Sequence, residues 1–333
     1  MAIRSLGNSA AKYNAVWAQT GLGGINVQPY LGSGVWYGSR GVFAGGQNPS
    51  YQTTIDYITI GSTGNASAFG DLTVARYAMP GSSNGTRGIF MGGYKGGSPG
   101  NSNDIDYITI GTTGNALDFG DLTAARDGAG GACDGLYAYC AGGNPGVFTA
   151  VIDYVNIEAT SNGSDFGDLT VARYLTTGAN DATRACFAAG DSATSGLVMN
   201  IIDYITMGSV LSDATDFGDL TKTLASPGGC SSSAGRGVWA GGYVDDSYNR
   251  TRNMDYVAIQ TTGNAGDFGD LASGYDADQP AGCSDGSRGI VGGGYNGAAT
   301  NIINYITIGS TGDATDFGDL TQARNYAAAA AGT

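Results

Sequence analysis

The apolar positions of the chain fall into short runs separated by clusters of Gly, Asn, Asp and Ser. Strings such as IDYITI, residues 55–60, place apolar side chains on both alternating faces of the run. A period of two bounded by turn residues predicts β-strands. Apolar side chains on both faces further predict that these strands are buried between neighbouring sheets.

The same landmarks recur six times along the chain. The string Phe-Gly-Asp-Leu begins at Phe69, Phe119, Phe166, Phe217, Phe268 and Phe317, at intervals of 50, 47, 51, 51 and 49 residues. The tyrosine of the IDYITI-like strings keeps the same register, as does a pair of small residues such as Gly45-Gly46 that ends an apolar run. Three landmarks in register predict six copies of one structural unit.

Each unit is predicted to form four short strands: a run of Ala, Gly and Ser, an RGIFMGG-like run, an IDYITI-like run, and DFGDLT after a TGN turn. Four strands with a period near 50 residues are typical of a propeller blade. The sequence therefore predicts an all-β, six-bladed β-propeller of four-stranded antiparallel blades. The C-terminal residues 325–333 have the character of a first strand, so we expect them to pair beside residues 40–46 and to close the ring.

The repeat resembles the kelch family of β-propellers. The shared features are the double glycine after the second strand, the tyrosine in the third strand and the arginine that opens the next unit, over residues 39–333. The chain has Phe where kelch repeats often have Trp. The wording DYITI…TGNATDFGDLT…AR also resembles repeats of bacteriophage tail-fibre and other virion proteins, which implies a phage particle as its setting.

The composition argues against catalysis and against several classes of partner. The chain has no histidine, and its one glutamate is Glu158. Triads, imidazole metal sites and the usual glycosidase carboxylate pairs are therefore disfavoured. The net charge of −14 argues against nucleic acid and anionic membrane surfaces. We expect a non-enzymatic protein without a signal peptide or a transmembrane segment.

Most charged residues are repeated with the units, which predicts structural roles. Nine arginines occupy two repeated positions: Arg76, Arg126, Arg173 and Arg324, and Arg40, Arg87, Arg184, Arg236 and Arg288. We expect them to bond carbonyls or a carboxylate between blades. We expect the aspartate of Phe-Gly-Asp to cap a turn by accepting backbone N–H bonds.

Two metal sites are weaker hypotheses. Pairs of aspartates spaced as DxxD, such as Asp118 and Asp121, suggest calcium, although they supply too few oxygens for a complete site. Cys133, Cys230 and Cys283 fall in predicted first strands, where three thiolates could hold a soft metal. Their offsets from the local landmarks differ, so we interpret the cysteines as small buried residues and predict no cofactor.

The candidate binding surface lies on the loops between the second and third strands, which differ most among the units. Variable loops on a rigid scaffold usually carry recognition. The fifth of these loops carries the richest chemistry, and the matching loops of other units add further aromatic and basic residues. The candidate residues are Tyr243, Asp245, Asp246, Tyr248, Arg250 and Arg252, with Tyr51, Tyr94, Lys95 and Tyr295. The alternative is that these are ordinary solvated loops.

Residues 1–38 lie outside the repeats. Their aromatic residues, Tyr13, Trp17, Tyr30 and Trp36, suggest an arm that docks on another virion protein or a lid over the ring.

These observations predict a phage virion protein, a tail fibre or another particle-surface component, that binds proteins or a host surface polysaccharide or receptor. The alternatives are a lectin-like bacterial propeller and an intracellular scaffold resembling cellular kelch proteins.

Overall fold

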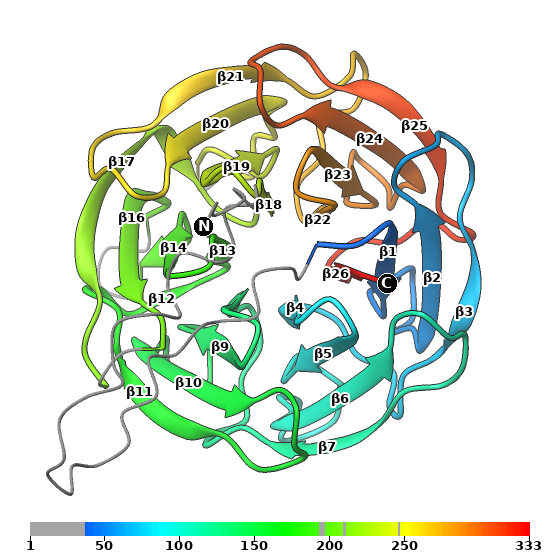
Figure 1. Cartoon of the computed structure of the whole chain (residues 1–333), viewed down its shortest axis with the longest axis vertical. Coiled ribbons are helices and arrows are strands. Elements are labelled where there is room, and N and C mark those ends of the chain that lie inside the picture. Colours follow the sequence, from blue (N-terminus) through cyan, green and yellow to red (C-terminus); the bar gives the residue numbers. More distant parts are fainter. Residues whose placement is uncertain (1–36, 193–196, 209–210, 246) are drawn as a thin grey trace, which may run out of the picture. The chain divides into compact units, whose positions relative to one another are not determined.

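The computed structural model describes residues 37–192, 197–208, 211–245 and 247–333, and they form a ring of six antiparallel four-stranded sheets. Figure 1 shows the ring viewed along its central channel, with each sheet forming one blade. The predicted all-β, six-bladed propeller is confirmed.

The blades are described here from the innermost strand to the outermost. Blade 1 contains β26 (Ala328–Gly332), β1 (Arg40–Ala44), β2 (Thr54–Thr59) and β3 (Ser67–Asp71). Blade 2 contains β4 (Gly81–Ser83), β5 (Arg87–Met91), β6 (Asp104–Thr109) and β7 (Leu117–Asp121). Blade 3 contains β8 (Gly130–Cys133), β9 (Tyr137–Ala141), β10 (Val151–Asn156) and β11 (Ser164–Asp168).

Blade 4 contains β13 (Thr177–Asn180), β14 (Arg184–Ala188), β16 (Met199–Thr206) and β17 (Thr215–Leu224). Blade 5 contains β18 (Gly228–Ser231), β19 (Arg236–Ala240), β20 (Asn253–Ala258) and β21 (Gly266–Asp270). Blade 6 contains β22 (Ala281–Ser284), β23 (Arg288–Gly292), β24 (Ile302–Thr307) and β25 (Thr315–Asp319). A short pair, β12 (Arg173–Tyr174) and β15 (Asp191–Ser192), adjoins blade 4.

The C-terminal strand closes the ring as the sequence predicts. Strand β26 pairs antiparallel with β1, with Ala330 opposite Val42 and Gly332 opposite Arg40. Blade 1 therefore takes its innermost strand from one end of the sequence and its other three from the opposite end. This arrangement pairs an edge that would otherwise be exposed.

Glycines permit the close contact between neighbouring blades. In five blades the second residue of the innermost strand, or its equivalent, is glycine, and in blade 1 it is Ala329. A Cβ on Gly178 would lie 2.1 Å from the carbonyl oxygen of Gly131 in the preceding blade. The small side chains predicted for the first strands therefore let six strands converge around a narrow channel.

The repeated arginines and aspartates form buried ion pairs between the connectors and the blades that follow. Arg173 Nη1 lies 2.9 Å from Asp203 Oδ2, Arg76 Nη2 lies 3.0 Å from Asp106 Oδ2, and Arg126–Asp153 and Arg324–Asp56 are equivalent. The same aspartates accept bonds from the threonine after Phe-Gly-Asp-Leu, as in Thr170 N–H to Asp203 Oδ2 at 3.0 Å. The expected bonding of arginine to carboxylates is confirmed.

The predicted role of the Phe-Gly-Asp aspartate is wrong, because the aspartate of the IDYITI-like strand caps the turn instead. The Phe-Gly-Asp aspartate uses its own backbone N–H, which donates to a side chain in the next blade's turn. Asp71 N–H donates to Asn115 Oδ1 at 3.1 Å, and Asp168 N–H donates to Asp213 Oδ1 at 3.0 Å. The intervening glycine has a positive φ in most blades and packs on the same turn.

Blades 5 and 6 depart from the ion-pair pattern. In blade 5, Leu224 stands in the place of the arginine, and Asn253 Nδ2 donates to Asp255 Oδ1 at 2.7 Å. In blade 6 the aspartate is replaced by Asn304. The connector that leads into this blade contains buried Tyr275, whose hydroxyl donates to the Gly293 carbonyl. Both blades lack the arginine. Blade 6 also lacks the buried carboxylate, and in blade 5 the carboxylate accepts an extra hydrogen bond.

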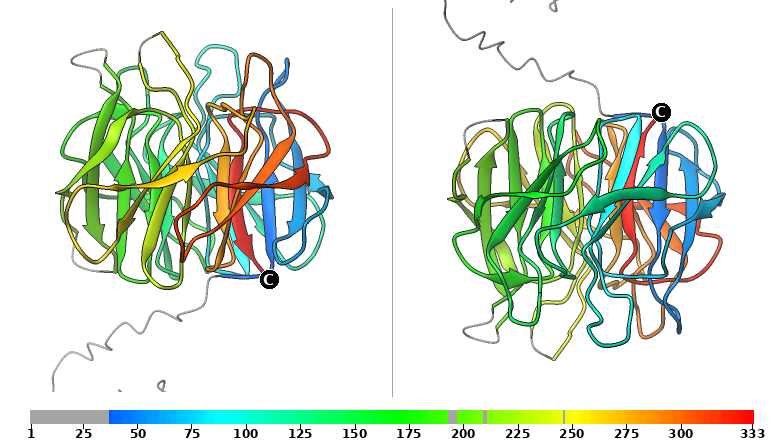
Figure 2. Two further views of the ribbon diagram at one scale, coloured as in Figure 1. Left: turned by 90° about the horizontal axis from the view of Figure 1, so that it is seen from above. Right: turned by 90° about the horizontal axis from the view of Figure 1, so that it is seen from below.

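The ring has two distinct faces. The loop face carries the loops between second and third strands: residues 45–53, 92–103, 142–150, 189–198, 241–252 and 293–301. The turn face carries the other turns of each blade and the C-terminus. Figure 2 shows loops extending beyond the sheets on one side and the C-terminus on the other.

Candidate functional site

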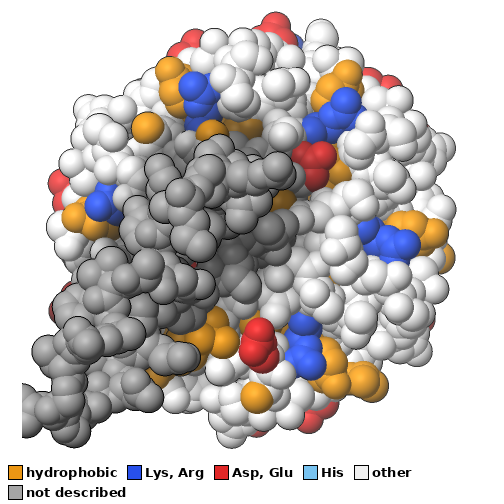
Figure 3. All heavy atoms as spheres, viewed as in Figure 1, with side chains coloured by type: hydrophobic (Ala, Val, Ile, Leu, Met, Phe, Trp, Pro, Cys, Tyr) orange, Lys and Arg blue, Asp and Glu red, His pale blue; other side chains and the backbone are white. Residues whose placement is uncertain are grey.

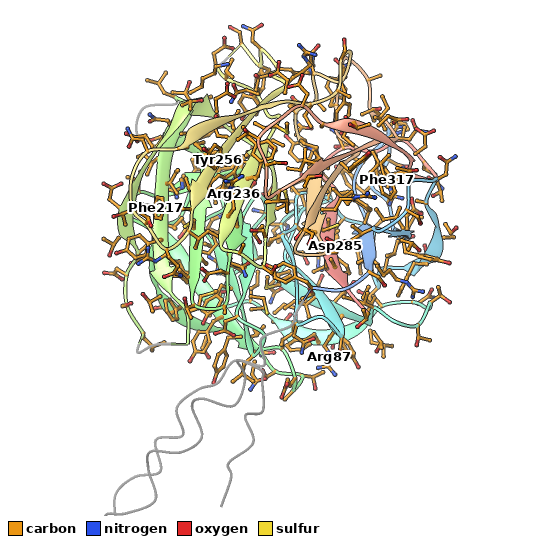
Figure 4. The ribbon with its side chains drawn as sticks, turned by 45° about the horizontal axis from the view of Figure 1, so that its top comes forward. Arg87, Phe217, Arg236, Tyr256, Asp285 and Phe317 are labelled. Atoms are coloured by element: carbon orange, nitrogen blue, oxygen red, sulfur yellow. The ribbon has the colours of Figure 1, made fainter. Side chains whose placement is uncertain are left out.

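The turn face repeats one arrangement around the ring. At the start of the second strand an arginine stacks on the tyrosine of the third strand, at 4.1–4.6 Å between guanidinium carbon and ring centroid, in five blades. The same arginine donates to a carbonyl of the next blade, as in Arg87 Nη1 to Ile157 O at 2.7 Å. Figure 4 labels one pair, Arg236 and Tyr256, and Figure 3 shows basic and hydrophobic side chains together around this face. In blade 3 this position is Tyr137, which packs on Tyr154. The five arginines therefore join neighbouring blades, as predicted.

On the loop face, a closed ring of six backbone hydrogen bonds surrounds the channel. It is formed by the residues Ala78, Gly128, Leu175, Ser226, Gln279 and Tyr326. Each N–H donates to the carbonyl of its counterpart in the preceding connector, at 2.7–3.1 Å. All six have φ between 55° and 63°. Five of them are not glycine, the residue that favours a positive φ. The closed ring of hydrogen bonds, rather than the residue type, therefore accounts for this strained conformation. The sequence gives no local signal for it.

Side chains around this ring form a tyrosine-rich rim. Tyr77, Tyr94 and Tyr51 pack together with ring centroids 5.2–5.9 Å apart, and Tyr326 lies 5.3 Å from Tyr77. Tyr174 donates its hydroxyl to Asp127 Oδ2 at 3.2 Å. Of these, the candidates Tyr51 and Tyr94 are brought together, whereas Tyr77, Tyr174 and Tyr326 were missed because they lie in connectors rather than in the variable loops. Their position one or two residues after the repeated arginine was the available signal.

The fifth loop is built around Asp245. Its carboxylate accepts bonds from the N–H groups of Ser247 and Asn249 and from Asn249 Nδ2, at 2.7–3.2 Å. The resulting turn holds Tyr248 in a left-handed conformation, with φ of 57°, and leaves 60% of its surface exposed. The Tyr248 ring lies 4.9 Å from that of Tyr243.

Tyr243 does not belong to the exposed surface that the sequence analysis assigned to it. It is 1% exposed, and its hydroxyl donates to Asp191 Oδ2 at 2.6 Å. This burial together with the neighbouring carboxylate raises the pKa of the Tyr243 phenol. Tyr243 therefore supports the loop from below, and its exposure in the candidate surface is corrected.

The two arginines of the fifth loop have different partners. Arg250 lies over Tyr295, 4.7 Å from the ring centroid, and its Nε lies 3.7 Å from Asp278 Oδ1. Arg252 lies nearer the outer edge, with Nε 3.3 Å from Asp276 Oδ1 and Nη2 3.5 Å from Asp270 Oδ2. The structure thus brings Arg250 and Tyr295 together and gives Arg252 other partners, whereas Tyr248, in the same loop as both arginines, packs on Tyr243.

The remaining candidate residues are dispersed. Lys95 belongs to blade 2, whereas the fifth loop belongs to blade 5. Its Nζ lies 3.0 Å from Asp104 Oδ2 of its own blade. Asp246 lies outside the described residues, as do Tyr13, Trp17, Tyr30 and Trp36 of the predicted arm.

Two carboxyl groups on the loop face are buried with an oxygen that accepts no hydrogen bond. They are Asp127 and Asp278, at 4% and 2% exposure, and in each case the atom is Oδ1. Burial raises the pKa of each to about 6, opposed at Asp127 by the Tyr174 hydroxyl and at Asp278 by Arg250.

The hypothetical metal sites receive no geometric support within the described ranges. No three His, Cys, Asp or Glu side chains there lie close enough to hold a metal ion. Cys133, Cys230 and Cys283 lie in the first strands as predicted, each within a different apolar cluster between blades. Their burial raises the pKa of each thiol. The calcium hypothesis for the DxxD aspartates stays a prediction.

We compared the chain with known protein families and curated proteins. No protein-family model matches the chain, and a search of curated proteins found no significant match. The fold therefore defines the class, a six-bladed β-propeller. Within the described residues, no helix is long and apolar enough to cross a membrane.

Proposed function

We propose that this propeller is a non-catalytic binding protein that recognises its ligand through the loop face. The observation that carries the proposal is the contrast between the two faces. The turn face repeats one arginine–tyrosine pair in five blades, whereas the six loops of the loop face differ in length and residues. Variable loops on a rigid frame are the usual location of recognition.

The chemistry of the loops supports recognition. Tyr, Ser, Gly and Asn dominate them, as in the strings QNPSY and YKGGSPGNSN. This composition resembles that of antibody binding loops, where tyrosine supplies contact area at little entropic cost and small polar residues supply hydrogen bonds. The absence of histidine from the sequence and the raised pKa of the buried thiols favour binding over catalysis.

The setting we propose is the surface of a bacteriophage particle, as a tail fibre or another exposed component. The sequence of the repeats, DYITI…TGNATDFGDLT…AR, supports this setting. The position of Tyr37, the first described residue, supports it as well. Tyr37 packs on the turn face, where a Cβ on Gly286 would lie 2.9 Å from its ring. An arm anchored on that side would leave the loop face free to contact a host surface.

The test is cryo-electron microscopy of the protein in its native assembly. We expect copies attached to a particle through the turn face or residues 1–36, with the loop face open to solvent. A loop face buried against neighbouring particle subunits, or a protein that is free of any particle, would contradict the proposal.

The alternative of a lectin with one equivalent pocket per blade is not proposed. The residue after the double glycine, at the base of each loop, is Gln47, Tyr94, Asn144, Asp191, Tyr243 or Tyr295. Equivalent pockets would need similar side chains at equivalent positions.

A further inference from the structure

The arginines that the structure describes fall into two groups, repeated and unrepeated, with different partners. Each of the nine repeated arginines donates a hydrogen bond or forms a close ion pair that joins blades. Arg250 and Arg252 are not repeated. Neither guanidinium donates a hydrogen bond to a described residue. Arg252 lies 3.3–3.5 Å from two carboxylates, whereas Arg250 has one carboxylate near it, at 3.7 Å.

The Arg250 guanidinium is nevertheless held in position. It stacks on Tyr295 at 4.7 Å, and its Nε is buried and faces Asp278 Oδ1 at 3.7 Å. The side chain is 28% exposed, while that of Asp278 is 3% exposed. Stacking on one side and a carboxylate beneath fix an arginine without using the paired donors of Nη1 and Nη2. A fixed guanidinium with free donors fits a planar carboxylate, because the two groups can form parallel hydrogen bonds.

Tyr248 supplies an aromatic surface in the same loop. Its ring is 60% exposed although its backbone has the left-handed φ of 57°, which disfavours a bulky residue. The three hydrogen bonds accepted by Asp245 hold this conformation. A strained, exposed tyrosine two residues before an arginine that donates no hydrogen bond to a described residue is an arrangement that packing alone does not explain.

We propose that Arg250, Tyr248 and Tyr295 form the binding site for a carboxylate-bearing saccharide, such as a uronate or sialate residue of a surface polysaccharide. Arg250 pairs with the sugar carboxylate, and Tyr248 packs against the sugar ring. The polar neighbours Ser247, Asn249 and Thr251 suit a ligand rich in hydroxyl groups. The overall charge of −14 disfavours a polyanion such as nucleic acid. This inference rests on the proposed function, because it names the ligand of the same loop face.

The experiment uses the full chain on an array of oligosaccharides that carry glucuronate, galacturonate or sialate residues, beside the same oligosaccharides with the carboxyl group reduced. The strongest ligand is then titrated against wild type, Arg250→Gln and the matched control Arg252→Gln. Tyr248→Gly removes the ring while suiting the left-handed backbone. Urea unfolding of each variant verifies that the fold is intact.

We expect the acidic oligosaccharide to bind at least about tenfold more tightly than its reduced counterpart, and Arg250→Gln to weaken binding by about tenfold or more. Arg252→Gln should change affinity by less than about twofold, because that side chain pairs with Asp270 and Asp276.

Four results would overturn the inference: no binding to any acidic oligosaccharide, equal binding of the reduced forms, equal effects of the two arginine variants, or tighter binding of the acidic peptide Gly-Glu-Gly. None of them bears on which face the native assembly exposes. The inference can therefore fail while the proposed function stands.

Discussion

The two faces of the ring use the same residue types for different purposes. On the turn face, arginine stacks on tyrosine in five blades and donates to a carbonyl of the next blade. On the loop face, Arg250 stacks on Tyr295 in the same manner, yet it donates to no described residue. The contact with the ring is common to both faces, and only the fate of the remaining donors differs. Repetition therefore marks the scaffold, and an unrepeated copy of a structural contact, with donors that no described residue uses, marks the candidate site.

The largest expected effect comes from breaking a buried ion pair of the scaffold. Arg173→Leu leaves Asp203 buried without its charge partner, which should lower the free energy of unfolding by about 3–5 kcal/mol. Urea denaturation measures this loss.

Blade 5 supplies a compensating change for the same variant. There, Leu224 stands in the place of the arginine and Asn253 donates to Asp255. The double variant Arg173→Leu with Ile201→Asn copies that arrangement, so it should recover part of the loss. A double variant that is less stable than the single one would show that Asn253 does not compensate in blade 5.

The convergence of the inner strands gives the next effect. Gly178→Ala places a Cβ 2.1 Å from the Gly131 carbonyl oxygen, so the two strands must separate. We expect a loss of about 1–3 kcal/mol in unfolding free energy, typical of overpacking. The matched control is Ala329→Gly in blade 1, where the native residue already has a Cβ, and it should cost about 1 kcal/mol or less. Similar costs at the two positions would contradict the close-contact explanation.

On the loop face, buried Asp127 should make stability depend on pH. Its pKa is raised to about 6 by burial, from an ordinary value near 3.8. The folded state therefore binds the proton more tightly than the unfolded state. The stabilisation is complete below about pH 4 and is lost as the pH rises through about 6.

Asp127→Asn removes this dependence. At pH 7 the variant should be more stable than wild type by roughly 2 kcal/mol, and at pH 4 the two should be nearly equal. Unfolding free energies at the two pH values, compared between variant and wild type, provide the check. A difference that stays constant between pH 4 and pH 7 would show that Asp127 does not titrate in this range.

The fold was predictable because its information is repeated. Six copies of Phe-Gly-Asp-Leu and the strand-like tail after Thr321 were sufficient to predict six blades and closure by residues 325–333. The assignment of the capping aspartate failed, because both aspartates recur in most units and their spacing does not tell which carboxylate faces the arginine. The replacement of Asp by Asn304 in a blade that also lacks the arginine carried that information.

The candidate site was predictable only as a region. Loop composition indicated the fifth loop, where Tyr248 is exposed and Arg250 stacks on Tyr295 of the neighbouring loop. The burial of Tyr243 against Asp191 and the outward pairing of Arg252 depend on contacts with other loops and blades. Such contacts join residues about 18–52 positions apart, and no local pattern encodes them.

The most direct test of the division between scaffold and site compares Arg87→Gln with Arg250→Gln in two parallel measurements, urea unfolding and titration with the acidic oligosaccharide. Arg87 stacks on Tyr107 and donates to Ile157 O, so its variant should lose about 1–2 kcal/mol of stability and keep its affinity. Arg250→Gln leaves buried Asp278 without its charged neighbour, so it should also lose about 1–2 kcal/mol of stability, but unlike Arg87→Gln it should lose binding about tenfold. Loss of binding in Arg87→Gln, or loss of stability without loss of binding in Arg250→Gln, would contradict the account.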